Sequence, residues 1–245
     1  MTEPNAGSDS GGTQTTATET AEGWVINGRK CFITNANHSG TFIVTAVFDR
    51  SLGAKGIGAF VVPRDTPGFS LEPGDHKLGM RGSDWASLVF EDARIPMDHL
   101  LGPKEEGFST FMKTLEGGRI SIAALSLGIA QGAYEEAVSY AKEREAFGKP
   151  LAAQQAVAFK LADMRTQIEA ARHLVYHSAR LKDTGQKYGA QAAMAKLHAS
   201  ETAMKVTYDA IQIHGGYGYI KEYGVEQDMR DSKIASIYEG TNGVQ

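Results

Sequence analysis

The sequence contains a single cysteine, Cys31, among its 245 residues. One cysteine excludes an internal disulfide framework and a metal cluster held by cysteines. This scarcity favours a reducing compartment such as the cytoplasm, or the mitochondrial matrix if the organism is a eukaryote.

Long apolar runs and blocks of basic residues are also missing. No stretch approaches the roughly 20 apolar residues of a membrane span, and no charged-then-apolar signal opens the chain. The formal net charge is -4, which provides no positive field for nucleic acid. We therefore expect a soluble protein that binds neither membranes nor nucleic acid.

The sequence does have the 42% of hydrophobic residues that a substantial core requires. Residues 13–103 are rich in Thr, Val, Ile and Gly, and short apolar runs predict strands at residues 41–48, 57–62 and 85–90. Asn27-Gly28 predicts a tight hairpin turn between two further strands. Residues 1–103 are thus predicted to form an antiparallel β domain, barrel-like or a sandwich.

Residues 104–245 have the composition and apolar period of helices. Helices are predicted over residues 108–147 and 189–213, with another between them. The apolar stripe of the middle helix consists of Leu161, Met164, Ile168, Ala171, Val175 and Ala179. Three long helices in succession predict a helical bundle and an α+β protein overall.

Small residues recur along the first of these helices. They are Ser121, Ala123, Ala124, Ser126, Gly128, Ala130, Gly132 and Ala133. Small side chains let another helix approach closely, and three helices leave an apolar face that requires a fourth partner. We therefore expect a homo-oligomer, a dimer or a tetramer.

Two segments of the β half have the residue types of a ligand site. The loop Thr2–Asp9 offers hydroxyls and backbone N–H groups, which bind phosphates or polar ring edges in some proteins and form plain loops in as many others. Phe32 and Thr34 end a strand on the same side of the sheet. An aromatic face beside a hydroxyl suits a planar cofactor, although the spacing alone favours a Phe32 packed in the core.

Three segments of the helical half are also candidates. Gly117 and Gly118 stand inside a helix, where each costs about 1 kcal/mol relative to alanine, so another group is expected to approach closely there. The segments 144–148 and 212–216 each close a predicted helix, which ordinary C-terminal capping explains.

Glu239 lies in the run Ile237-Tyr238-Glu239-Gly240-Thr241-Asn242 near the end of the chain. A carboxylate beside a flexible glycine and a hydroxyl is suited to act as a base on a bound substrate, although taken alone a solvated glutamate is the better interpretation. His173 and His177 are four residues apart on a helix, but no third ligand is indicated, so no metal site is predicted.

Together these segments closely resemble the acyl-CoA dehydrogenase family, specifically its short-chain (butyryl-CoA) branch. The motifs TEPNAGSD, FITN, KLGMRGSD, EREAFGKP, QIHGGYGY, MRD and IYEGT occur in family order over all 245 residues. The resemblance implies a flavoprotein oxidoreductase of fatty acid β-oxidation. With bound FAD it converts a short acyl-CoA to the trans-2-enoyl-CoA and passes electrons to an electron-transfer flavoprotein.

The resemblance also implies roles for individual residues. By this resemblance Glu239 is expected to be the base that removes the α-proton. Substrate contacts are implied for Ser8, Glu116, Gly117, Gly118, Arg119, Tyr238 and Gly240. Cofactor contacts are implied for Thr2, Gly7, Ser8, Phe32, Ile33, Thr34, Arg144, Phe147, Gln155, Gln212, Ile213, His214, Gly215, Gly216, Thr241, Asn242 and Gly243. Of these, Arg144, Gln155, Gln212 and Gly216 resemble positions that reach the cofactor of a neighbouring subunit.

Two departures from the family pattern bear on activity. Some branches carry the base at the position of Gly118, where glycine cannot serve, so Glu239 is the only candidate. Relatives also carry a helical domain before this sequence and a helix after it, so the chain is expected to be a fragment. The alternative hypothesis is a catalytically silent α+β oligomerisation scaffold that binds flavin poorly.

Overall fold

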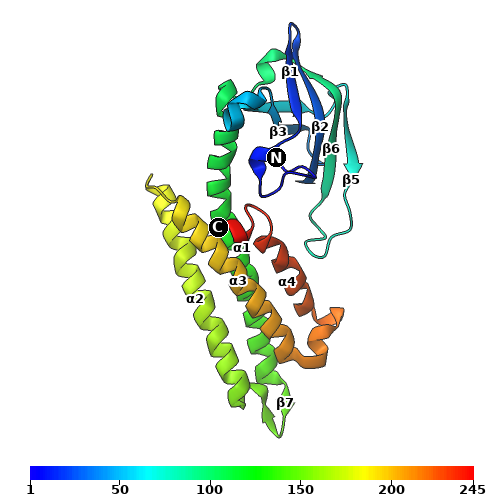
Figure 1. The fold of residues 1–245 in the computed structure, drawn as a ribbon. Coiled ribbons are helices and arrows are strands. Elements are labelled where there is room, and N and C mark those ends of the chain that lie inside the picture. Colours follow the sequence, from blue (N-terminus) through cyan, green and yellow to red (C-terminus); the bar gives the residue numbers. More distant parts are fainter. The chain divides into compact units, whose positions relative to one another are not determined.

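The computed structural model describes residues 1–245, and the chain forms two compact units (Figure 1). Unit 1 contains residues 1–77 and 81–113, and unit 2 contains residues 78–80 and 114–245. The division falls inside the long helix α1 (Gly107–Glu143), and the domain boundary at residues 103/104 stays a prediction. None of the helices combines the length and apolar character needed to cross a bilayer.

Unit 1 is built on one six-stranded sheet. Its strands are β1 (Thr16–Thr20), β2 (Gly23–Thr34), β3 (Thr41–Val47), β4 (Ile57–Pro63), β5 (Phe69–Pro73) and β6 (Trp85–Ile95), in the spatial order β4-β3-β1-β2-β6-β5. All neighbours are antiparallel except β1 and β3, which are parallel because the connection from β2 crosses over β1. The three predicted strands and the α+β class are confirmed, and the sheet does not close into a barrel.

The sheet nevertheless curls around an aromatic core. Phe42 on β3 and Phe69 on β5 have ring centroids 5.0 Å apart, although three strands separate β3 from β5 in the sheet. Phe69 also lies 5.3 Å from Phe90 on β6. Burying each such side chain stabilises the fold by roughly 1.5–3 kcal/mol, so these rings hold the curled sheet together.

Asn27-Gly28 is not a hairpin turn, contrary to the sequence-based prediction. Both residues lie inside β2, where the pairing with β6 shifts register between Ile26 and Gly28. Gly28 has φ +144, and a Cβ there would come within 2.6 Å of the Thr15 hydroxyl. Glycine is therefore needed for a β-bulge and a close strand crossing. The hairpin lies instead between Thr20 and Gly23.

Unit 2 is a helical bundle of α1, α2 (Gln155–Asp183), α3 (Gly189–His214) and the short α4 (Val225–Ser232). Alanines of α1 and α3, including Ala130 and Ala203, are fully buried in its core and let the helices pack closely. The three long helices are confirmed. On α2 the last buried position is Ser178 and not Ala179. The eight-residue α4 is mostly polar and short, so the apolar pattern of the sequence does not predict it.

The first long helix ends at Glu143, four residues before the predicted end at Phe147. Instead of a helical cap, residues 145–150 form a hairpin of β7 (Glu145–Ala146) and β8 (Lys149–Pro150). Phe147 and Gly148 at its tip both have positive φ, as a two-residue turn requires. The capping interpretation is correct for Gly215, which follows α3 at φ +60 and donates its N–H to Gln212.

The small residues of α1 lie on two faces. Ala123, Ser126, Ala130 and Ala133 are buried within the unit, whereas Ser121, Ala124, Gly128 and Gly132 are exposed. Half of the pattern is thus explained by packing inside the chain. A homo-oligomer stays a prediction.

Candidate active site

Glu239 is held in an unusual backbone conformation at the end of unit 2. It has φ +55 and the following Gly240 has φ +84. A positive φ at a non-glycine residue costs about 1–3 kcal/mol and persists only where the surrounding structure enforces it. The strain therefore marks the segment as one shaped for something other than stability.

The Glu239 carboxylate is half-buried and has neither an ion pair nor a hydrogen bond in the structure. Its neighbour is Gly118 of α1, where a Cβ would lie 2.9 Å from Glu239 Oε2. The predicted close approach at the two glycines thus comes from the chain's own side chains. At Gly117 the approaching group is the Lys182 ammonium, 3.0 Å from a would-be Cβ.

Burial raises the pKa of Glu239, and the nearby charges of Lys196 and Arg119 oppose this rise. Burial also raises the pKa of Tyr238, and so does the adjacent Glu239. A carboxylate that is partly desolvated but not neutralised by an ion pair is a more basic group than one in water.

The segment that carries Glu239 is fastened to α3 by polar contacts. Lys196 has no exposed surface, and its Nζ donates to Gly240 O at 2.8 Å and to Asn242 Oδ1 at 3.0 Å. Asn242 Nδ2 donates to Ser200 Oγ at 2.9 Å and to Glu201 Oε1 at 2.6 Å. Thr241 Oγ1 donates to Ser236 O at 3.3 Å. The side chains of two predicted cofactor residues, Thr241 and Asn242, are thus engaged within the chain.

Two further predicted substrate residues flank Gly117 and Gly118 on α1. The guanidinium of Arg119 is 3.6 Å from the position of a Cβ on Gly240, and its Nε is buried without a hydrogen-bond partner. Glu116, one turn earlier on the same face, lies 3.3 Å from a would-be Cβ on Gly189 at the start of α3. An unpaired buried donor is costly, so Arg119 has capacity left to bind a ligand.

In unit 1 the N-terminal loop is anchored by a buried ion pair that sequence reasoning missed. Lys30 Nζ lies 2.6 Å from Glu3 Oε1, and the two side chains are 0% and 3% exposed. Glu3 also accepts from the backbone N–H groups of Gln14 and Thr15. The sequence offered one signal, because Lys30 lies in a strand at one of the alternating positions whose side chains face the core.

The loop and the end of β2 present the expected ligand-binding groups at the surface. Gly7, Ser8, Phe32 and Thr34 are exposed, and Thr2 and Ile33 are partly buried. Phe32 is 57% exposed at φ +60 in a bulge, with its ring 4.9 Å from that of Trp85, so the interpretation of Phe32 as a core residue is wrong. An exposed aromatic ring beside hydroxyls fits a planar heteroaromatic group.

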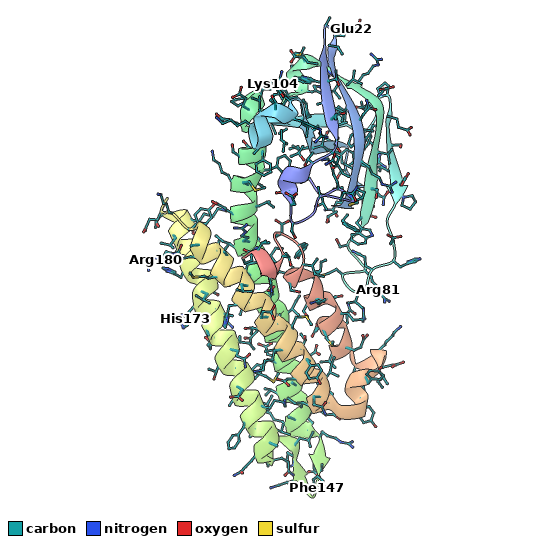
Figure 2. All side chains as sticks on the ribbon, viewed as in Figure 1. Glu22, Arg81, Lys104, Phe147, His173 and Arg180 are labelled. Atoms are coloured by element: carbon teal, nitrogen blue, oxygen red, sulfur yellow. The ribbon has the colours of Figure 1, made fainter.

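The remaining predicted cofactor residues lie around the β7–β8 hairpin, the start of α2 and the end of α3. Arg144, Gln155, Gln212 and Gly216 are exposed there, and Phe147 is 95% exposed at the tip of the β7–β8 hairpin (Figure 2). Ile213 and His214 are buried, the latter stacked on Tyr140 at 4.3 Å. Along α3, Lys196 and His214 are 18 residues apart, or about 27 Å at 1.5 Å per residue. The predicted cofactor residues of unit 2 therefore form two groups, one near the Lys196 end of α3 and one near its His214 end.

Comparison with known proteins identifies the family. Residues 1–93 match the acyl-CoA dehydrogenase middle domain, and residues 105–245 match the acyl-CoA dehydrogenase C-terminal domain. The chain belongs to the acyl-CoA dehydrogenase family. The resemblance inferred from the sequence is thereby confirmed.

Individual acyl-CoA dehydrogenases match the whole chain. The short-chain specific acyl-CoA dehydrogenase of Clostridium acetobutylicum is 51% identical over 245 residues, which are 100% of this chain and 65% of that protein. The structure of butyryl-CoA dehydrogenase from Megasphaera elsdenii matches with a TM-score of 0.97 and 50% identity. The match covers 99% of this chain and 63% of the Megasphaera elsdenii chain.

A third relative is the caffeyl-CoA reductase–Etf complex subunit CarC of Acetobacterium woodii, 47% identical over 100% of this chain and 65% of that protein. The chain spans slightly less than two thirds of the length of these relatives. The fold of an acyl-CoA dehydrogenase is therefore shown for the part described here.

Proposed function

We propose that this chain is the flavin-binding and base-carrying part of a short-chain acyl-CoA dehydrogenase, with Glu239 as the catalytic base. The observation that carries the proposal is the half-buried carboxylate of Glu239, unpaired, in a strained backbone and seated against Gly118. The names of the relatives from Clostridium acetobutylicum and Megasphaera elsdenii support a short acyl-CoA as substrate.

In the proposed reaction the Glu239 carboxylate takes the α-proton of the acyl thioester. Such a proton is weakly acidic, so a base of raised pKa and donors that stabilise the developing enolate are both needed. FAD, when bound, supplies the acceptor for the hydride that leaves the β-carbon. The trans-2-enoyl-CoA is the product. Arg119 adds a positive charge near the base, with a donor still free to bind the substrate.

Residues of the N-terminal loop and of the end of β2 are proposed to hold the cofactor. Phe32 offers a ring face, and Thr2, Ser8 and Thr34 offer hydroxyls, with Gly7 leaving open backbone between them. We assign the same role to Ile33 and to the 241–243 segment. This assignment rests on the exposure of Gly7, Ser8, Phe32 and Thr34 and on the family to which the chain belongs.

The protein is proposed to work as a homo-oligomer. The span of about 27 Å along α3 between Lys196 and His214 supports this, because it separates the residues at the His214 end from the Glu239 segment and leaves them available to a second copy. Arg144, Phe147, Gln155, Gln212 and the 213–216 segment are assigned to that contact. An electron-transfer flavoprotein is proposed as the electron acceptor, since the Acetobacterium woodii relative is named as part of an Etf complex.

Glu239→Gln tests the assignment of the base, because glutamine keeps the shape and removes the basic oxygen. The flavin-loaded holoenzyme is mixed with butyryl-CoA without oxygen, and loss of the oxidised flavin absorbance is followed. We expect the variant to bind flavin and to lose reduction by at least about 10³-fold, the order of a missing general base. Glu105→Gln, an exposed glutamate of unit 1, is the matched control.

Two outcomes would contradict this proposal. Flavin reduction by the Glu239→Gln variant at the wild-type rate would assign proton abstraction to another group. A wild-type protein that stays colourless after incubation with FAD would favour the alternative of a silent scaffold.

A further inference from the structure

Lys196 lies on the face of α3 that packs into the core, where a lysine is unexpected. Its side chain has no exposed surface, and the flanking core positions Ala192, Ala195 and Ala199 are also fully buried. Burying an ammonium is costly unless it is paired and hydrogen-bonded. A buried ammonium beside three buried alanines requires an explanation beyond packing.

The contacts of Lys196 all lead to the segment that follows Glu239. Its Nζ donates to Gly240 O at 2.8 Å and to Asn242 Oδ1 at 3.0 Å, and no carboxylate lies within ion-pair distance. Each acceptor has a second donor, because Gln245 Nε2 also reaches Gly240 O at 2.7 Å and Ser200 Oγ reaches Asn242 Oδ1 at 3.2 Å. The segment is therefore held without Lys196, although less tightly.

The ammonium also acts on Glu239 through its charge. Lys196 and Arg119 are the cations that oppose the raised pKa of Glu239, while Glu239 and Glu201 in turn favour the charged form of Lys196. Burial and Arg119 lower the pKa of Lys196 to about 8, so it stays mainly charged at neutral pH. Tyr238 is the other titratable group coupled to Glu239.

We infer that Lys196 is a positioning residue of the proposed reaction, which sets both the place and the basicity of the Glu239 carboxylate. It fixes the Gly240 carbonyl, and with it the strained Glu239 backbone, and it keeps the carboxylate ionised without forming an ion pair that would neutralise it. The inference rests on the proposed function of Glu239 as the base.

Lys196→Met separates this role from plain packing. Methionine fills similar space and leaves no buried charge, and the two acceptors keep their second donors, so folding is preserved. In the flavin-loaded holoenzyme we expect the rate constant of flavin reduction by butyryl-CoA to fall about tenfold to a hundredfold, as for a base displaced by a fraction of an ångström to one ångström. The KM is expected to change little by comparison.

The pH profile is the readout that a structural role would not move. Removing a cation raises the pKa of Glu239, so the acid limb of the reduction rate moves to higher pH in Lys196→Met. Lys196→Arg keeps the charge and is expected to restore the wild-type acid limb with only partial recovery of the rate. Ser200→Ala removes both hydrogen bonds between Ser200 and Asn242 and no charge, so its acid limb stays at the wild-type pH.

A readout without activity is the hydrogen exchange of residues 239–244 in the protein without flavin. We expect faster exchange in Lys196→Met than in wild type, because the Gly240 and Asn242 contacts are lost. The inference would be overturned if Lys196→Met had the wild-type reduction rate, the wild-type acid limb and the wild-type hydrogen exchange, even if Glu239→Gln is inactive. If Glu239→Gln itself keeps activity, the proposed function fails first, and the two failures are thereby distinguished.

Discussion

Gly118→Ala is predicted to make the protein more stable and less active at the same time. Gly118 lies inside α1, and alanine gains about 1 kcal/mol over glycine in a helix interior. The new Cβ would lie 2.9 Å from Glu239 Oε2 and 3.7 Å from its Cδ. The carboxylate is the far end of a flexible side chain, so it can move away at little cost, and the helix keeps its gain.

The size of the effect follows from this geometry. An ordinary carbon–oxygen contact is about 3.3–3.6 Å, so the carboxylate must move by roughly 0.5 Å. A displacement of 1 Å costs on the order of a hundredfold in rate, which makes roughly tenfold the expected loss here. The stability gain of about 1 kcal/mol corresponds to a rise in Tm of roughly 2–4 °C for a protein of this size.

The assay combines thermal unfolding with stopped-flow reduction of the bound flavin by butyryl-CoA. Gly132→Ala, on the same helix with nothing within 4 Å of the new Cβ, is the control for helix propensity. It is expected to raise Tm by a similar amount and to leave the reduction rate unchanged, with gel filtration confirming the same oligomeric state. A Gly118→Ala variant that reduces flavin within twofold of wild type would refute the contact or the role of Glu239.

Two predictions concern stability. Glu3→Gln should lower the free energy of unfolding by roughly 3–5 kcal/mol, because it leaves Lys30 as an unpaired buried charge. The double variant Glu3→Gln with Lys30→Met should recover most of this loss. Equal Tm values by circular dichroism for wild type and the single variant would contradict the prediction. Burial, with Glu136 and Asp231 nearby, raises the pKa of Asp228 to about 6. The stabilisation from protonated Asp228 is present below its ordinary pKa of about 4 and is lost as pH rises through about 6. Asp228→Asn should therefore raise Tm at pH 7.5 and not at pH 4. Equal changes in Tm at the two pH values would exclude this titration.

The sequence was sufficient for the long elements and for the family. Short apolar runs predicted the strands at residues 41–48 and 57–62, and the helical apolar period predicted the three long helices, because apolar positions mark the residues that become buried. Where local residue preference was used alone, the prediction failed. Asn27-Gly28 has the composition of a turn, yet the crossing of Thr15 over β2 makes it a bulge.

Residue types by themselves determined the class of this protein, its two differing halves and the order of motifs that point to an acyl-CoA dehydrogenase. Tertiary structure alone decided what each motif touches. Gly118 faces Glu239, which follows it in the sequence by 121 residues, and Lys196 holds the loop behind that carboxylate. Such contacts depend on how helices pack, and no local pattern records them, because a buried lysine and an exposed one have the same letter in the sequence.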